Sequence, residues 1–182
     1  MGVLYMMYLA TILNHDTKPR FGYADDIGLY RVGKNLQETT TAIGHDVANI
    51  LAWGNKHRLA FAPDKLEMVH ITNKRKDADN PTCFVNDTLT IEPVPLPTRS
   101  RTAGNDTQPA LRWLGIWFDR KLTFRRHVAK RVGKARRVAQ HIRALGRIRH
   151  GPPAVALRKA MITCVLPSLL YGIEVWYAGR TK

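Results

Sequence analysis

Two adjacent carboxylates, Asp25 and Asp26, lie between short alternating apolar runs in the stretch FGYADDIGLY, residues 21–30. Asp is common in turns because its side chain can hydrogen-bond the nearby backbone, so an ordinary hairpin tip is one interpretation. A metal site is the other, because neighbouring carboxylates raise the cost of ionising both, and a divalent cation removes that cost. Mg²⁺ is usually held by one or two carboxylates together with substrate phosphates. The residues alone leave both interpretations open.

The excess of positive over negative charge lies in the C-terminal part of the chain. Residues 1–111 contain 12 Lys/Arg and 12 Asp/Glu, whereas residues 112–182 contain 17 Lys/Arg and only Asp119 and Glu174, so the net charge of +15 lies there. A neutral part followed by a basic part is typical of a protein that binds a polyanion. Nucleic acid fits best, and a merely solvated surface is the alternative. A membrane surface fits less well, because the basic segment has no aromatic residue on its apolar stripe.

The cysteines and the apolar N-terminal stretch exclude two further classes of protein. Cys83 and Cys164 have no zinc-ligand spacing and form no disulfide framework, so we expect a reducing compartment. The stretch GVLYMMYLATIL is too short to span a bilayer, which needs about 18 or more apolar residues. It predicts a buried helix over residues 3–13. A first helix this apolar needs a partner surface, so we expect the chain to start in the middle of a fold.

Hydrophobic periodicity and turn residues predict the elements that hold the acidic pair and the basic segment. We expect a hairpin over 20–32, a helix over 35–58, a strand over 67–72, a hairpin around Asn86 and Asp87, and a Pro-rich loop over 93–110. Beyond the loop we expect a strand over 113–118, a basic helix over about 124–148, and a helix over 154–170 interrupted at Pro167. We expect Trp53, Trp117 and Trp176 to be core residues, and His127 and His141 to be phosphate-facing or neutral surface residues.

Five stretches recur in an order and spacing that resembles one family. They are GVLYMMYLATIL, YADD (23–26), WGNKHRLAFAPDKLEMVHI, LRWLGIWFDRKLTFRRHV and VLPSLLYGIEVWY. Together they resemble the reverse transcriptase of non-LTR (LINE-type) retrotransposons, over nearly the whole chain except 73–110. The second box carries Trp53, Leu59, Phe61 and Lys65.

The resemblance implies an α+β fold, in which a partial polymerase palm of antiparallel β-hairpins packed on helices is followed by an α-helical thumb. The expected parts are a partial palm with the YADD hairpin (1–92), a Pro-rich loop (93–110), primer-grip-like strands (111–124) and a basic helical thumb (125–182).

The same resemblance implies roles for the residues of the YADD and lysine boxes. Asp25 and Asp26 would be catalytic metal ligands for Mg²⁺, or for Mn²⁺ in its place, in a two-metal transfer onto a primer 3′-hydroxyl. Lys65 would neutralise the departing pyrophosphate or protonate it, and a surface lysine is the alternative. Tyr23 would pack under the primer end, and a core strand aromatic is the alternative.

The remaining binding residues follow from the primer-grip and thumb boxes. Trp113, Leu114 and Gly115 would shape the primer grip, where Gly lets the backbone approach nucleic acid closely. The cations expected to face phosphates are Arg125, Arg126, Lys130, Arg131, Lys134 and Arg137. Such contacts position a duplex without reading its sequence.

The chain departs from the family in one respect. The family's active site needs a further Asp on a strand about 60 or more residues upstream of YADD, whereas only 24 residues precede Asp25. We therefore expect a polymerase fragment that does not polymerise alone, with an RNA template, a DNA primer, dNTP and a missing N-terminal palm and fingers half as partners. The alternative is a nucleic-acid-binding remnant without chemistry. Either would act inside the cell, in the nucleus or in a cytoplasmic ribonucleoprotein, and not at a membrane.

Overall fold

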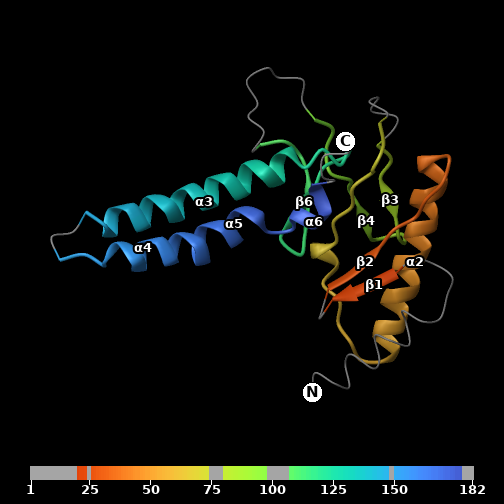
Figure 1. The fold of residues 1–182 in the computed structure, drawn as a ribbon. Helices are drawn as coiled ribbons and strands as arrows, with labels where there is room; N and C mark the ends of the chain where they lie inside the picture. The colour runs from red at the N-terminus through yellow and green to blue at the C-terminus, as the bar shows by residue number, and fades with distance from the viewer. Residues whose placement is uncertain (1–19, 24–25, 74–79, 98–106, 148–149, 178–182) are drawn as a thin grey trace. The chain divides into compact units, whose positions relative to one another are not determined.

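The computed structural model describes residues 20–23, 26–73, 80–97, 107–147 and 150–177 (Figure 1). The chain divides into two compact units. Unit 1 comprises Met1–His70 and Lys74–Val94, and unit 2 comprises Ile71–Asn73 and Pro95–Lys182. The predicted helix over 3–13 and the tip residues 24–25 lie outside the described residues.

In unit 1, strand β1 (Arg20–Tyr23) pairs antiparallel with β2 (Asp26–Leu29). The register sets Arg20 opposite Leu29 and Tyr23 opposite Asp26, which confirms the hairpin predicted over 20–32. Asp26 therefore begins the return strand, directly after the tip.

Helix α2 (Leu36–Lys56) confirms the helix predicted over 35–58. The Asn35 side chain caps it by accepting from the Gln37 backbone N–H at 3.0 Å. Its apolar face covers the short hairpin of β3 (Cys83–Phe84) and β4 (Thr90–Ile91), with a core of Val47, Met68, Cys83 and Ile91. A Cβ at Gly44 would lie 2.3 Å from the Phe84 carbonyl oxygen, so glycine permits this close approach of helix and strand.

An ion pair fixes the segment after β2 to α2. The Arg31 Nε donates to Asp46 Oδ2 at 2.7 Å, and Arg31 Nη2 contacts the same oxygen. Asp46 is buried, so the pair compensates a charge that would otherwise be costly inside the protein.

The strand predicted over 67–72 is wrong. Met68 makes only an isolated bridge with Pro93, and a short 3₁₀ helix, η1 (Pro63–Lys65), precedes it. Met68 and His70 are buried, which accounts for the alternation that suggested a strand. The segment has other hydrogen-bond partners than a neighbouring strand. The His70 ring contacts the Pro81 carbonyl at 2.9 Å, and the Thr72 N–H donates to the Arg120 carbonyl at 2.9 Å.

The described strands of unit 2 form a hairpin where a single strand over 113–118 was predicted, so that prediction is wrong. Strands β5 (Leu111–Trp113) and β6 (Ile116–Phe118) pair antiparallel. Leu114 and Gly115 form the turn, with φ of 46° and 78°. A two-residue hairpin turn with both residues at positive φ matches the twist of the flanking strands.

Asp119 organises the loop between the hairpin and the basic helix. Its Oδ1 accepts from the Phe124 N–H at 2.6 Å, and its Oδ2 accepts from the Thr123 N–H and hydroxyl, both at 3.0 Å. Leu122 and Phe124 have φ of 51° and 54°, so this carboxylate stabilises a backbone that bends sharply into the helix.

Two long helical segments run side by side away from that loop (Figure 1). The first is α3 (Arg125–Leu145), which confirms the basic helix predicted over 124–148. The second consists of α4 (Ala154–Ala160), a π-helical turn η3 (Met161–Val165) and α5 (Leu166–Leu170), followed by α6 (Ile173–Trp176). Pro167 does not interrupt this segment; a π turn accommodates its missing N–H.

The run Ala154–Trp176 is long and apolar enough to cross a membrane by length and composition, and only 6% of its apolar window is buried. Its helix is broken, however, because Gly172 has φ of 69°. Ala154 to Leu170 extends roughly 25 Å at about 1.5 Å per residue, against a hydrocarbon core of about 30 Å.

Candidate nucleic-acid interface

The Leu114–Gly115 turn is held by side chains from two helices of unit 2. The Arg131 Nη2 donates to the Gly115 carbonyl at 3.0 Å, and the Tyr171 hydroxyl donates to the Leu114 carbonyl at 2.6 Å. The guanidinium carbon of Arg131 lies 4.0 Å from the centre of the Tyr171 ring. The turn, α3 and the end of α5 therefore form one connected group.

Two glycines allow this approach. A Cβ at Gly115 would lie 3.3 Å from the Tyr171 ring and hydroxyl, and a Cβ at Gly172 would lie 3.0 Å from the Ile116 side chain. Both glycines also have positive φ, a conformation that other residues rarely adopt. The Leu114–Gly115 pair and the Tyr171–Gly172 pair are therefore in contact, although they are 57 residues apart in the sequence.

His127 ties the same elements together from inside. It is fully buried, its Nε2 contacts the Tyr171 carbonyl at 3.1 Å, and the Trp117 N–H donates to its Nδ1 at 3.4 Å. The ring is then neutral, with Nδ1 accepting and Nε2–H donating. Burial lowers the pKa of His127 below 6.5, the Tyr171 carbonyl opposes that shift, and the charge of Arg131 adds to it. The prediction that His127 faces phosphates or solvent is therefore wrong.

A cavity of about 560 Å³ adjoins the turn, and we call it the proximal cavity. Three cations line it, from β5 and from two successive turns of α3: Arg112, Arg131 and Lys134. None of the described residues that line it is acidic. The Ser168 hydroxyl, which also lines it, is buried without a hydrogen-bond partner in the described part of the chain. The cavity thus offers three positive charges and one unused donor to an anion.

The charges around Arg131 also favour a bound anion. Burial lowers the pKa of Arg131 below its ordinary value, and the neighbouring charge of Arg112 lowers it further, while Tyr171 opposes the shift. Two cations therefore repel each other at the edge of the cavity, and a bound anion would relieve that repulsion.

The structure brings some of the predicted binding residues together and separates others. Leu114, Gly115, Arg131 and Lys134 all line the proximal cavity. Arg126 instead lies 4.1 Å from the centre of the Trp117 ring and donates to the Gln108 carbonyl at 2.8 Å. The predicted residues that are on unit 2 but do not line the proximal cavity are Trp113, Arg125, Arg126, Lys130 and Arg137.

Tyr23, Asp26 and Lys65 lie on unit 1, and Asp25 lies outside the described residues. Tyr23 is 65% exposed, so it is not a core aromatic. Asp26 is exposed at the start of β2, and Lys65 is exposed at the end of η1. No group of three His, Cys, Asp or Glu that could hold a metal ion occurs among the described residues.

Sequence reasoning missed Arg112, Tyr171 and Ser168 as lining residues. Arg112 lies two residues before the Leu114–Gly115 turn, so hairpin geometry could have placed it beside that turn. Tyr171 belongs to a stretch that carried the family resemblance, but nothing local indicated its contact with Leu114. The Trp residues predicted to be core, Trp53, Trp117 and Trp176, are half-buried.

Comparison with known proteins gives one distant relative. The probable RNA-directed DNA polymerase from transposon BS of Drosophila melanogaster is 28% identical over 154 residues, which cover 85% of this chain and 15% of the relative. The chain thus spans a small part of that protein's length. No protein-family model and no solved structure matches the chain. The chain is a distant relative of part of a transposon RNA-directed DNA polymerase, which supports a broad relationship with the reverse transcriptase family.

Proposed function

We propose that this chain is the palm and thumb portion of a LINE-type reverse transcriptase, and that unit 2 holds the duplex of RNA template and DNA primer. The observation that carries the proposal is the proximal cavity, where three cations and a free hydroxyl surround a turn fixed by Arg131 and Tyr171. The relative's name supports the same class of protein.

The proximal cavity suits the backbone of nucleic acid. Arginine can hold a phosphate through two parallel hydrogen bonds, and a buried serine hydroxyl can add a third donor. Contacts to phosphates are independent of base sequence, as a copying enzyme requires.

The exposed cations of α3 extend this surface. Arg125, Lys130 and Arg137 are exposed on the helix that carries Arg131 and Lys134. We propose that they contact further phosphates of the same duplex. Six such contacts would give a slope of roughly −5 for log K against log salt.

For the chemistry, we propose that Asp25 and Asp26 supply two of the carboxylates that hold Mg²⁺ in the whole polymerase. Among the described residues, no group of three His, Cys, Asp or Glu could hold a metal ion by itself. We therefore expect the chain alone to bind nucleic acid and not to extend a primer.

A binding experiment tests the duplex interface. Fluorescence anisotropy with a labelled RNA–DNA duplex, measured from 50 to 200 mM salt, should give tight binding with a steep salt slope. Arg112→Gln/Lys134→Gln should reduce the steepness by about 2, since each phosphate contact contributes about 0.9. Arg158→Gln/Lys159→Gln is the matched control, because it removes the same charge from exposed positions on α4 outside the cavity. Equal effects of both variants, or no binding at low salt, would refute the proposal.

Primer extension distinguishes the two classes of function. The chain is incubated with an RNA template, a DNA primer, dNTP and Mg²⁺ or Mn²⁺, with Asp25→Asn as the control. Duplex binding without extension is the expected result, and it agrees equally with a non-catalytic nucleic-acid-binding remnant. Extension that disappears in Asp25→Asn would establish a polymerase and would show that our expectation of inactivity is wrong.

A further inference from the structure

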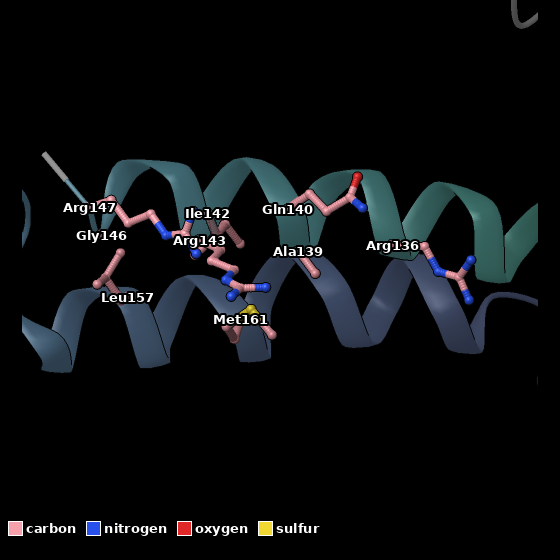
Figure 2. Close-up of a pocket in the computed structure, with 9 residues that line it drawn as sticks. All are labelled: Arg136, Ala139, Gln140, Ile142, Arg143, Gly146, Arg147, Leu157 and Met161. Atoms are coloured by element: carbon pink, nitrogen blue, oxygen red, sulfur yellow. The ribbon is translucent and has the colours of Figure 1, made fainter.

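A second cavity, of about 580 Å³, lies between the far end of α3 and the facing helical segment, and we call it the distal groove (Figure 2). Its floor is apolar, with Ala139, Ile142 and Gly146 from α3 and its C-cap, Leu157 from α4, and Met161 from η3. Its rim carries Arg136, Arg143 and Arg147.

The floor of the distal groove is partly open to solvent. Met161 is 40% exposed, Ala139 and Leu157 are half-buried, and Ile142 is buried. Gly146 has no side chain to fill the space, and a Cβ there would already lie 3.0 Å from the Leu157 Cδ1. The groove therefore leaves apolar surface available between cationic side chains.

The three arginines of the rim are unpaired. In the part of the chain that the structure describes, Arg136, Arg143 and Arg147 have no hydrogen bond or ion pair, unlike Arg131 and Arg126. Figure 2 shows the Arg143 side chain extending from α3 toward Met161 on the facing segment. No acidic residue lines the groove. The partner should therefore be an anion with a flat apolar part.

From this combination we propose that the distal groove binds an unpaired nucleotide of single-stranded nucleic acid. The base lies on the floor beside Leu157 and Met161, and the flanking phosphates contact Arg143 and Arg147. The exposed bases of single strands can stack on guanidinium planes such as those of the rim arginines, whereas the bases of a duplex are stacked and paired with each other.

The inference rests on the proposed function and extends it from duplex to single strand. Arg131 and Arg143 are twelve residues apart on α3, which is roughly 18 Å along the helix. One nucleic acid can therefore engage the proximal cavity as a duplex and the distal groove where the strand is unpaired.

The test compares single-stranded and duplex ligands on the full chain. Labelled 12-nucleotide oligo(dT), oligo(rU) and a blunt RNA–DNA duplex are titrated against the wild type and Arg143→Gln/Arg147→Gln. In Arg143→Gln/Arg147→Gln we expect the affinity for both single strands to fall about tenfold or more, because a charge-assisted contact contributes on that order. The affinity for the duplex should fall less than about threefold. The salt slope for the single strands should become shallower by about 1.4. Arg158→Gln/Lys159→Gln again removes equal charge outside the groove, and circular dichroism confirms that each variant is folded.

An abasic oligonucleotide of the same length and charge tests the floor. The wild type should bind it several-fold more weakly than oligo(dT), and Met161→Gln should reduce that difference. Equal affinity for both ligands would overturn the proposal, because the groove would then recognise charge alone.

Other partners give other results. Two results would overturn the inference. One is competition by polyglutamate that depends on Arg143 and Arg147 as strongly as oligo(dT) binding does. The other is equally dependent binding to vesicles rich in phosphatidylserine. Normal duplex binding together with an unchanged single-strand affinity in Arg143→Gln/Arg147→Gln would refute this inference and leave the proposed function standing. Failure to bind either ligand would refute both.

Discussion

The two ends of the paired helices in unit 2 use the same residue types in opposite ways. At the proximal end, Arg131 binds a carbonyl and stacks on Tyr171, and His127 is fully buried. At the distal end, Arg143 and Arg147 are exposed and unpaired in the described part of the chain, and His141 is exposed. Charge along one helix therefore divides into cations that stabilise the fold and cations left free for a ligand.

This difference matters because a basic helix read from sequence suggests one uniform surface. Buried or stacked cations contribute to stability, while exposed cations mostly repel one another and contribute little to stability. Substitutions that are equivalent in charge should then affect stability where the cation is buried or stacked, and binding where it is exposed. The following changes test that contrast, from the largest expected effect on stability to the smallest.

His127→Ala should lower the free energy of unfolding of unit 2 by about 3 kcal/mol. It leaves a cavity and removes the hydrogen-bond partners of the Trp117 N–H and the Tyr171 carbonyl. His141→Ala, on the same helix but exposed, should change it by less than about 0.5 kcal/mol. Urea denaturation followed by circular dichroism measures both, and similar losses would contradict the contrast between the two ends.

Gly172→Ala should cost about 2 kcal/mol, because alanine is strained at φ of 69° and its Cβ would press on Ile116. Gly133→Ala should instead raise stability by up to about 1 kcal/mol, since a Cβ in that helical position meets nothing within 4 Å. Thermal melts compare the pair. A melting temperature that falls in both variants would show that helix α3 is more tightly packed at Gly133 than described.

Acid should destabilise unit 2 through His127. Its pKa is lowered in the folded state, so the unfolded chain takes up the proton first as the pH falls below about 6.5. The contribution is fully present above that pH and is lost as the pH falls toward the folded pKa, with a limiting slope of about 1.4 kcal/mol per pH unit. Urea midpoints from pH 8 to pH 5 measure it; the slope should shrink in His127→Gln and persist in His141→Gln.

Arg147→Gln should have the smallest effect on stability, less than about 0.5 kcal/mol in either direction. Arg147 is exposed, lies just beyond the end of α3, and its side chain has no partner among the described residues. Arg131→Gln is the contrasting variant, expected to cost about 1 kcal/mol because the Gly115 carbonyl loses its donor. If Arg147→Gln lost as much stability as Arg131→Gln, cations with a protein partner and cations without one would not differ in their contribution to stability.

Local patterns were sufficient to predict the long elements. Helices α2 and α3 have apolar residues at helical spacing, so both helices were predicted within a few residues. The hairpins of β1–β2 and β3–β4 were predicted from alternation around acidic turns. The strand over 67–72 failed because alternating burial of Met68 and His70 occurs without a neighbouring strand to pair with.

The candidate site depended on contacts between distant residues, which no local pattern contains. The sequence placed Arg131 and Lys134 on a basic helix, but it could not show that Arg131 binds Gly115 or that Arg126 lies on Trp117. His127 resembled a surface residue because its neighbours in sequence are basic, and its partners lie 10 and 44 residues away. The distal groove had no sequence signal, because its floor comes from three separate helical elements.

The links from His127 to Trp117 and Tyr171 hold the paired helices at one end only. Lengthening both helices by seven residues, two full turns each, would add about 10 Å of reach while leaving every contact at the hairpin in register. Homologous proteins could therefore differ in the length of the paired helices without losing their attachment to the hairpin. The distance from the turn to the helical tip would then set how far along the bound strand the protein reaches.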